Sequence, residues 1–276
     1  MCLPLMYIKE ITMKYKFIAA DMDGTLLNDE SRLSERTKTA IRKALEAGAF
    51  FTTATGRAAS GVESVSELLD KDMPLIVLNG ASVVMSKSRE VLFNKYLDIS
   101  LVKEVYDMGM VCGVSMMIRA SEWLWANRES KATIGYRNAY NADMKVISDI
   151  NDLDSESVYK VLWFETAESI RRLSSEMNEY FKGRLNCHSS LPTVLEFVSI
   201  EADKGSAMAE IGRIYGIDRS EMIAVGDGYN DVSMLKYAGL GIAMANAPDD
   251  VKAVCKEVTL SNNDDGVAAV IEKYIL

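Results

Sequence analysis

Two aspartates, Asp21 and Asp23, follow directly after the apolar run 17–20, which is typical of a buried strand in a parallel sheet. Gly24 lets the chain turn tightly, so we expect both aspartates at the carboxyl end of that strand, where open α/β sheets build their sites. Residues i and i+2 of a strand face the same side, and two carboxylates there repel each other unless a cation or proton compensates. The pair therefore indicates a site that needs a cation.

Two plainer interpretations of this Asp-x-Asp spacing are a solvated turn and a calcium-binding loop. A calcium loop of the EF-hand type requires Gly at its sixth position and Glu at its twelfth. Counted from Asp21, these positions hold Leu26 and Arg32, so the calcium loop is excluded. An ordinary turn stays open on this segment alone.

Three further polar clusters follow predicted strands or begin a predicted helix. Each alone has a structural explanation, such as a helix cap or a solvated lysine. A lysine at a helix N-terminus is disfavoured by the helix dipole, however, and makes more sense beside an anion. The carboxyl ends of parallel strands meet at one sheet edge, so we expect the clusters to converge there. Their members are Thr55 and Gly56, Lys204, and the segment from Asp227 through Asn230 to Asp231.

Together these groups meet the chemical needs of phosphoryl transfer from a monoester. A phosphate dianion requires a hard cation, a lysine and hydrogen-bond donors around it. A carboxylate can attack phosphorus and form an acyl phosphate, and a second carboxylate can deliver a proton to the leaving oxygen. Mg²⁺ suits such a site because it accepts a few carboxylates and keeps several waters.

Strands and helices alternate at both ends of the chain, which is the pattern of a parallel sheet with crossover helices. We predict strands at 17–20, 49–53, 75–78, 222–225, 240–244 and 257–260. Helices are expected from the Ser34 cap to Ala47 with Gly48 after it, from about 58 to Leu69, and over 204–215 and 232–238. The fold class is thus α/β, with a Rossmann-like parallel sheet core.

The middle of the chain differs, with all three tryptophans and strand pairs mixed with amphipathic helices. A chain of 276 residues also exceeds the usual single domain. We therefore predict an inserted α+β domain over 86–191, which would act as a cap, and a core made of 1–85 and 192–276.

Composition excludes several classes of function. The net charge of -9 argues against nucleic acid, which requires a basic footprint, and no apolar run reaches the length of a membrane span. The four cysteines form no Cys-x-x-Cys, which favours a reduced cytoplasmic setting, and the single histidine excludes a two-histidine zinc site. Residues 1–12 lack the features of a signal peptide and contain no motif, so we expect a dispensable extension before Met13.

The four clusters resemble the four motifs of the haloacid dehalogenase superfamily. The form of the Thr-Gly-Arg motif and the large insert before the lysine resemble its Cof-type phosphatase branch, whose cap is of the C2 type. The similarity covers about 14–85 and 192–270, and the insert matches in length and position only. The motifs are Asp21-Met22-Asp23-Gly24-Thr25, Ala54-Thr55-Gly56-Arg57, Lys204 and Gly226-Asp227-Gly228-Tyr229-Asn230-Asp231.

The resemblance implies a role for each motif residue. Asp21 would be the nucleophile and Asp23 the general acid and then base. Mg²⁺ would be bound by the carboxylates of Asp21 and Asp227 and the carbonyl of Asp23, with Asp231 orienting its waters. The phosphoryl oxygens would be held by Met22, Thr55, Gly56, Lys204 and Asn230.

Three functions remain open at this point. The first is a Mg²⁺-dependent phosphatase for small phosphorylated metabolites, for example sugar phosphates. The second is a phosphomutase or phosphotransferase on the same fold, which would pass the phosphoryl group to an organic hydroxyl. The third is a non-catalytic binding protein, which the intact set of aspartates and lysine disfavours. The phosphatase is our prediction, and the oligomeric state does not follow from the sequence.

Overall fold

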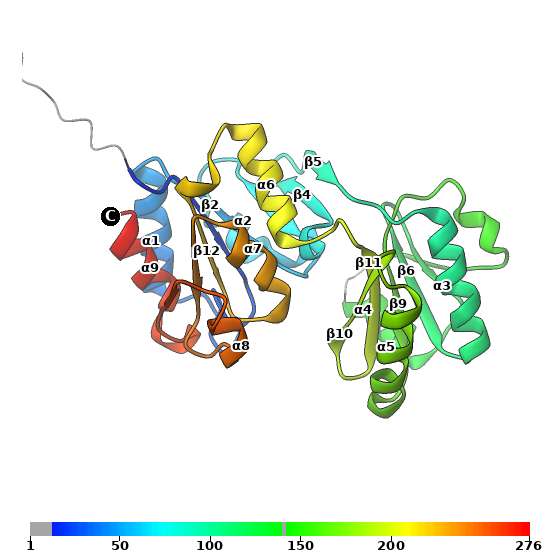
Figure 1. Ribbon diagram of the computed structural model, residues 1–276. Coiled ribbons are helices and arrows are strands. Elements are labelled where there is room, and N and C mark those ends of the chain that lie inside the picture. Colours follow the sequence, from blue (N-terminus) through cyan, green and yellow to red (C-terminus); the bar gives the residue numbers. More distant parts are fainter. Residues whose placement is uncertain (1–12, 140–141) are drawn as a thin grey trace, which may run out of the picture. The chain divides into compact units, whose positions relative to one another are not determined.

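Strand β1 (Phe17–Ala20) lies inside a five-stranded sheet in the computed structural model, which describes residues 13–139 and 142–276 (Figure 1). The strand order is β14-β13-β12-β1-β2, and every pairing from β1 to β14 is parallel. The other strands are β2 (Phe50–Thr53), β12 (Met222–Gly226), β13 (Leu240–Ala243) and β14 (Glu257–Val258). Strands β1, β12 and β13 are buried along their whole length, as an apolar run in a parallel sheet should be.

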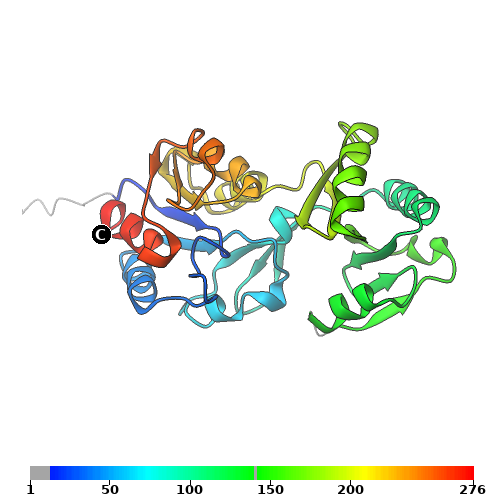
Figure 2. The ribbon, with the colours of Figure 1, turned by 90° about the horizontal axis from the view of Figure 1, so that it is seen from below.

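Helices cover this sheet on both faces (Figures 1 and 2). On one face α1 (Glu35–Glu46) and α9 (Gly266–Tyr274) lie side by side, and α7 (Val232–Tyr237) packs on the other against β12 and β13. The short α8 (Asp249–Lys252) follows Pro248, and α6 (Lys204–Tyr215) precedes β12. This alternation confirms the predicted α/β class with a parallel sheet.

The ends of α1 follow from local chemistry. The Ser34 side chain accepts a hydrogen bond from the Thr37 amide, and Gly48 follows the last turn with a φ of +94°. That left-handed conformation is strained for any residue with a Cβ, which is why glycine ends the helix there.

By internal packing the described residues divide into two compact units. The first unit comprises the described residues up to Thr52 together with Gly212–Leu276, and the second comprises Thr53–Ile211. The domain boundaries expected near 85 and 192 differ from these and stay a prediction. The expected extension 1–12 lies outside the described residues.

The second unit contains two further sheets. The smaller is antiparallel, with β3 (Pro74–Val77), β4 (Ser82–Met85) and β5 (Val91–Asn94) in that order, and Ala54 forms a parallel bridge to Ile76 of β3. The larger has the order β10-β11-β9-β6-β7-β8, with only the last pair parallel. Its strands are β6 (Ser115–Ala120), β7 (Leu124–Ala126), β8 (Met144–Val146), β9 (Val158–Phe164), β10 (Leu185–Leu191) and β11 (Val194–Ser199).

Both faces of the six-stranded sheet carry apolar clusters. One includes Trp163 and Phe197, together with residues of α3 (Ile99–Cys112) and α5 (Ala167–Tyr180). The other centres on Met117 and Leu162 and includes Tyr136 of α4 (Lys131–Ala139). Alternating side chains of the same strands fill both clusters, as the two-residue period of a strand requires.

The helix predicted from about 58 to Leu69 is wrong. The segment forms a 3₁₀ turn, η1 (Ala59–Gly61), and then the four-residue helix α2 (Glu63–Ser66). Gly61 weakens a helix by about 1 kcal/mol relative to alanine, and neither element begins with a side-chain cap. The strand predicted over 257–260 is also shorter, since β14 ends at Val258.

Among the described helices, none is both long and apolar enough to cross a bilayer.

Candidate active site

Three aspartates of the first unit meet at the carboxyl edge of the five-stranded sheet. Strands β1 and β12 pair in parallel with Ala20 opposite Val225, and the Asp21 amide donates to the Val225 carbonyl at 2.9 Å. Asp21 and Asp227 therefore leave the sheet at the same edge. Oxygens of Asp21, Asp227 and Asp231 lie within 4.8 Å of one another. Asp21 and Asp231 are buried, so close carboxylates at this point favour a bound cation.

Asp231 fixes the loop that carries Asp227. Its Oδ2 accepts the amide of Asp227 at 2.9 Å and the amide of Gly228 at 2.8 Å. A Cβ on Gly226 would lie 2.6 Å from the Asp231 carboxylate, so only glycine fits there. Through these contacts Asp231 orients the loop that carries Asp227.

Thr25 was not singled out as a site residue from the sequence, although it lies in the first motif. Its Oγ1 donates to Asp227 Oδ1 at 2.6 Å, and its side chain is buried. Gly24, with a φ of +80°, packs so closely that a Cβ would lie 2.6 Å from Asp227 Oδ2. The chain after β1 thus holds the Asp227 carboxylate from two sides.

The remaining predicted residues of the first unit differ in exposure. Asp23 and Asn230 are exposed, which leaves them accessible to a ligand. The Met22 side chain is fully buried, and the Met22 carbonyl accepts the amides of Leu26 and Leu27 at 3.1 and 2.9 Å. The chain therefore makes a hydrogen-bonded turn directly after Asp21.

The second unit brings its own predicted residues together. The Thr55 amide donates to Ile76 O at 3.0 Å, and the Asn79 amide donates to Thr55 O at 2.8 Å. A Cβ on Gly56 would lie 3.1 Å from Asn79 Oδ1. Asn79 therefore lies beside the Thr55–Gly56 turn.

Lys204 belongs to the same part of the second unit. A Cβ on Gly80 would lie 2.1 Å from Asp203 O and 2.8 Å from the Lys204 amide, so the turn after Asn79 packs against the start of α6. The Asp203 carboxylate accepts the Ser206 amide at 2.9 Å and caps this helix. Lys204 and Thr55 are both buried. The sequence does contain a signal for this turn, because an Asn-Gly pair directly follows the third predicted strand.

The carboxylate cluster of the first unit fits Mg²⁺. Its donors are oxygens of aspartates, which hard cations prefer, and neither histidine nor cysteine belongs to the group.

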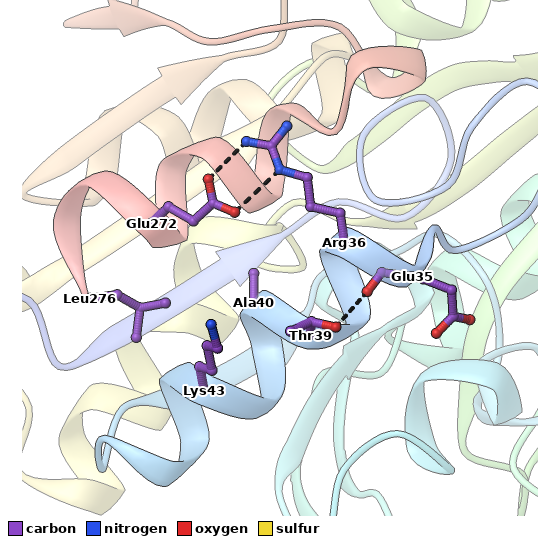
Figure 3. A pocket seen from close by; sticks show the side chains of 7 residues that line it. All are labelled: Glu35, Arg36, Thr39, Ala40, Lys43, Glu272 and Leu276. Atoms are coloured by element: carbon purple, nitrogen blue, oxygen red, sulfur yellow. Dashed lines mark hydrogen bonds and ion pairs between the residues drawn. The ribbon is translucent and has the colours of Figure 1, made fainter.

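A hollow of about 300 Å³ on the first unit contains none of the predicted site residues (Figure 3). It lies between α1 and α9, where Arg36 forms a bidentate ion pair with Glu272, with an N–O distance of 2.8 Å. This hollow is therefore separate from the aspartate cluster.

The family model of haloacid dehalogenase-like hydrolases matches residues 18–271. The chain belongs to this family. The match includes all the predicted site residues, and the resemblance inferred from the four motifs is confirmed.

Similar proteins extend over nearly the whole chain. The 5-amino-6-(5-phospho-D-ribitylamino)uracil phosphatase YcsE of Bacillus subtilis is 28% identical, over 98% of this chain and 100% of its own length. YitU of the same organism, named for the same activity, is 27% identical over 93% of this chain and 96% of its own. A solved haloacid dehalogenase-like hydrolase from Bacteroides thetaiotaomicron is 28% identical, with a TM-score of 0.80, over 94% of this chain and 99% of its own. The predictions of a Cof-type family member and of a phosphatase are thereby confirmed.

Proposed function

We propose that the protein is a Mg²⁺-dependent phosphatase that hydrolyses small phosphorylated metabolites through a phosphoryl group held on Asp21. The observation that supports it best is the meeting of Asp21, Asp227 and Asp231 within 4.8 Å at one sheet edge of a chain in this hydrolase family. Such a cluster suits a dianionic phosphate only when a cation is added.

The first half of the reaction uses two aspartates. A carboxylate oxygen of Asp21 attacks phosphorus, and the bond from phosphorus to the substrate's alcohol oxygen breaks. Asp23, protonated at that moment, gives its proton to the departing oxygen, so that a neutral alcohol leaves. Burial of Asp21 limits competing solvation of its carboxylate, while exposure of Asp23 lets it exchange protons with water.

The second half restores the enzyme. Asp23, now a carboxylate, takes a proton from a water molecule whose oxygen attacks phosphorus. The bond between phosphorus and Asp21 breaks, and inorganic phosphate leaves.

The metal would be held by the carboxylates of Asp21 and Asp227 and the carbonyl of Asp23, while Asp231 orients its waters. When bound, Mg²⁺ neutralises charge on the phosphoryl oxygens and on the attacking carboxylate. Thr25 and Asp231 would keep Asp227 aimed at the ion through the hydrogen bonds described above.

On the basis of the motifs, we propose that five groups bind the phosphoryl oxygens. They are Lys204, the Thr55 hydroxyl, the Gly56 amide, Asn230 and the Met22 amide. In support of this assignment, Lys204 is buried at the first residue of α6, and a lysine ammonium group is a common binder of phosphate.

The substrate class follows from the same chemistry. These groups recognise a phosphoryl group, and we propose that 86–191 forms the domain that selects the alcohol, inserted into a core of 1–85 and 192–276. The relatives named for a ribitylaminouracil phosphate support a small polyol-containing phosphate as substrate. The negative net charge disfavours nucleic acid as a partner, and the free Cys112, Cys187 and Cys255 support a reducing compartment such as the cytoplasm.

The test is release of inorganic phosphate from a panel of phosphorylated metabolites by the purified full chain with Mg²⁺. The variant Asp21→Asn should fold and release no phosphate, because an amide cannot form the acyl phosphate. The control Asp249→Asn changes an exposed aspartate at the start of α8 in the first unit and should keep full activity. Substantial phosphatase activity in Asp21→Asn would contradict the proposed mechanism.

A further inference from the structure

The side chains of two asparagines of the first unit form hydrogen bonds with the backbone that follows Asp21, the proposed nucleophile. Asn246, after β13, donates from Nδ2 to the Gly24 carbonyl at 2.7 Å. Asn262, in the 3₁₀ turn η6 (Asn262–Asp264), donates from Nδ2 to the Leu27 carbonyl at 3.1 Å. The two are joined, because the Asn262 amide donates to Asn246 Oδ1 at 3.1 Å. We call this pair the asparagine clip.

The clip holds both ends of a short segment that matters for the site. The carbonyl oxygen of Gly24 belongs to the peptide group that carries the Thr25 amide, so fixing this oxygen fixes the plane of that peptide. Thr25 in turn donates to Asp227 at 2.6 Å, and Asp23 directly precedes Gly24. The hydrogen bond from Asn246 to the Gly24 carbonyl therefore restrains both Asp227, a proposed metal ligand, and Asp23, the proposed acid.

A carboxylate cannot replace both functions of the Asn246 side-chain amide, and a small apolar residue can replace neither. Its Nδ2 must donate to one carbonyl while its Oδ1 accepts from one amide. An aspartate would keep the acceptor but place an oxygen against the Gly24 carbonyl, where two acceptors repel each other. An alanine would remove both contacts.

We infer that Asn246 is a positioning residue of the phosphatase reaction, acting through the Gly24–Thr25 peptide on Asp23 and Asp227. The inference rests on the proposed function. It predicts two effects that follow from misplacing these two groups: weaker Mg²⁺ binding, and slower turnover that is most severe when the leaving group needs a proton.

The experiment compares wild type, Asn246→Asp and Asn246→Ala as full-length proteins. Mg²⁺ binding is measured by isothermal titration calorimetry without substrate, and kcat is measured for p-nitrophenyl phosphate and for an alkyl phosphate. We expect the Mg²⁺ dissociation constant to rise about tenfold or more in both variants. The alkyl phosphate should lose more of its kcat than the activated ester, because only the alkyl leaving group depends strongly on Asp23.

The matched control is Asn263→Ala. Asn263 belongs to the same turn, but its contacts are to Asp29, beyond the clipped segment. For the Asn263→Ala variant, the Mg²⁺ affinity and the ratio of the kcat values for the two esters should stay within about twofold of wild type.

The possible outcomes separate the inference from the function. If folded Asn246→Asp and Asn246→Ala bind Mg²⁺ as wild type does and keep the wild-type ratio of the two esters, Asn246 is merely structural and the inference is wrong, even if the melting temperature falls. If wild type binds Mg²⁺ but hydrolyses no ester, the proposed function fails. Calorimetry of the variants still decides whether the clip positions the metal ligand.

Discussion

The Thr25 hydroxyl donates to Asp227 Oδ1 across 2.6 Å, although the two residues are 202 positions apart in the chain. This hydrogen bond joins the loop after β1 to the loop after β12, and both loops carry proposed metal ligands. Because Thr25 is buried, water does not substitute easily for its hydroxyl. The orientation of Asp227 therefore depends on a residue outside the proposed set of metal ligands.

We predict that Thr25→Val weakens Mg²⁺ binding about tenfold or more, because valine keeps the shape of threonine and removes the donor to Asp227. Thr25→Ser keeps a hydroxyl and should retain most of the affinity. Calorimetric titration of Mg²⁺ into each variant measures the effect. Equal affinities for the valine and serine variants would show that the hydrogen bond does not orient the ligand.

Two glycines with similar backbones provide a second test. Gly24 and Gly48 have φ values of +80° and +94°, so alanine at either position should cost about 1–2 kcal/mol of folding stability. At Gly48 nothing lies within 4 Å of the added Cβ, whereas at Gly24 the Cβ would meet Asp227 Oδ2 at 2.6 Å.

Gly24→Ala should therefore lose Mg²⁺ binding and turnover as well as stability, and Gly48→Ala should lose stability alone. Urea denaturation gives the free energies of unfolding, calorimetry gives the Mg²⁺ affinities, and a phosphate-release assay gives the turnover rates. Wild-type Mg²⁺ affinity in Gly24→Ala would mean that Asp227 can move aside without harm.

The parts of the fold that were predictable from sequence depend on local patterns. Strand β1 and helix α6 have the predicted bounds, and α1 begins after its Ser34 cap as expected. Apolar runs, caps and C-terminal glycines act over a few residues, so a single sequence shows them. The break at Gly61 was missed because the surrounding residues suit a helix.

The site was predictable only as far as its motifs. Asp21, Asp227 and Asp231 were expected together because parallel strands end at one sheet edge, and the structure places them together. The supporting contacts of Thr25 and Asn246 depend on which loops lie next to each other after the sheet has formed. No spacing in the sequence encodes such a neighbour 202 or 222 positions away.

Removal of the metal should abolish activity. An excess of EDTA should stop phosphate release, and added Mg²⁺ should restore it. Ca²⁺ should be a poor substitute, because its longer bonds and looser geometry would misplace the Asp21 carboxylate. The assay is phosphate release against metal concentration, and full activity in excess EDTA would exclude the proposed mechanism.

The six-stranded sheet contains a buried ion pair whose loss should be costly. Lys160 Nζ of β9 lies 2.9 Å from Glu196 Oε2 of β11, and each side chain is 6% exposed. Lys160→Met leaves a buried carboxylate without this partner and should destabilise the fold by about 3–5 kcal/mol. Replacing both residues, as Lys160→Met with Glu196→Leu, should recover much of that loss.

The control for this prediction is an exposed pair on α5. Arg172 Nη1 lies 2.8 Å from Glu176 Oε1, and Arg172→Met should cost less than about 1 kcal/mol. Urea denaturation measures all three variants. A double variant as unstable as Lys160→Met alone would show that the charges themselves are required in this sheet.

His188 of β10 lies opposite Glu196 of β11. We predict that it makes the stability of the folded protein depend on pH. Its Nε2 is buried and has no hydrogen-bond partner among the described residues, although the side chain as a whole is 37% exposed and Nε2 lies 3.9 Å from Glu196 Oε2. Burial lowers the pKa of His188, the Glu196 carboxylate partly opposes this, and the Lys160 ammonium lowers the pKa further. His188 therefore has a lower pKa in the folded protein than in the unfolded chain, where a histidine has a pKa of about 6.5.

The sign follows from proton counting. Between the pKa of the unfolded histidine and its lower folded value, the unfolded state binds more protons, so stability falls as the pH falls through this window. Below the folded pKa both states are protonated and this contribution becomes constant. His188→Asn removes the titrating group, so the difference in unfolding free energy between wild type and variant should shift against wild type on going from about pH 7.5 to about pH 5. Urea denaturation over that range measures the difference, in which the titration of other groups cancels. A constant difference, or one that moves in favour of wild type as the pH falls, would show that His188 is protonated at least as easily in the fold as in the unfolded chain.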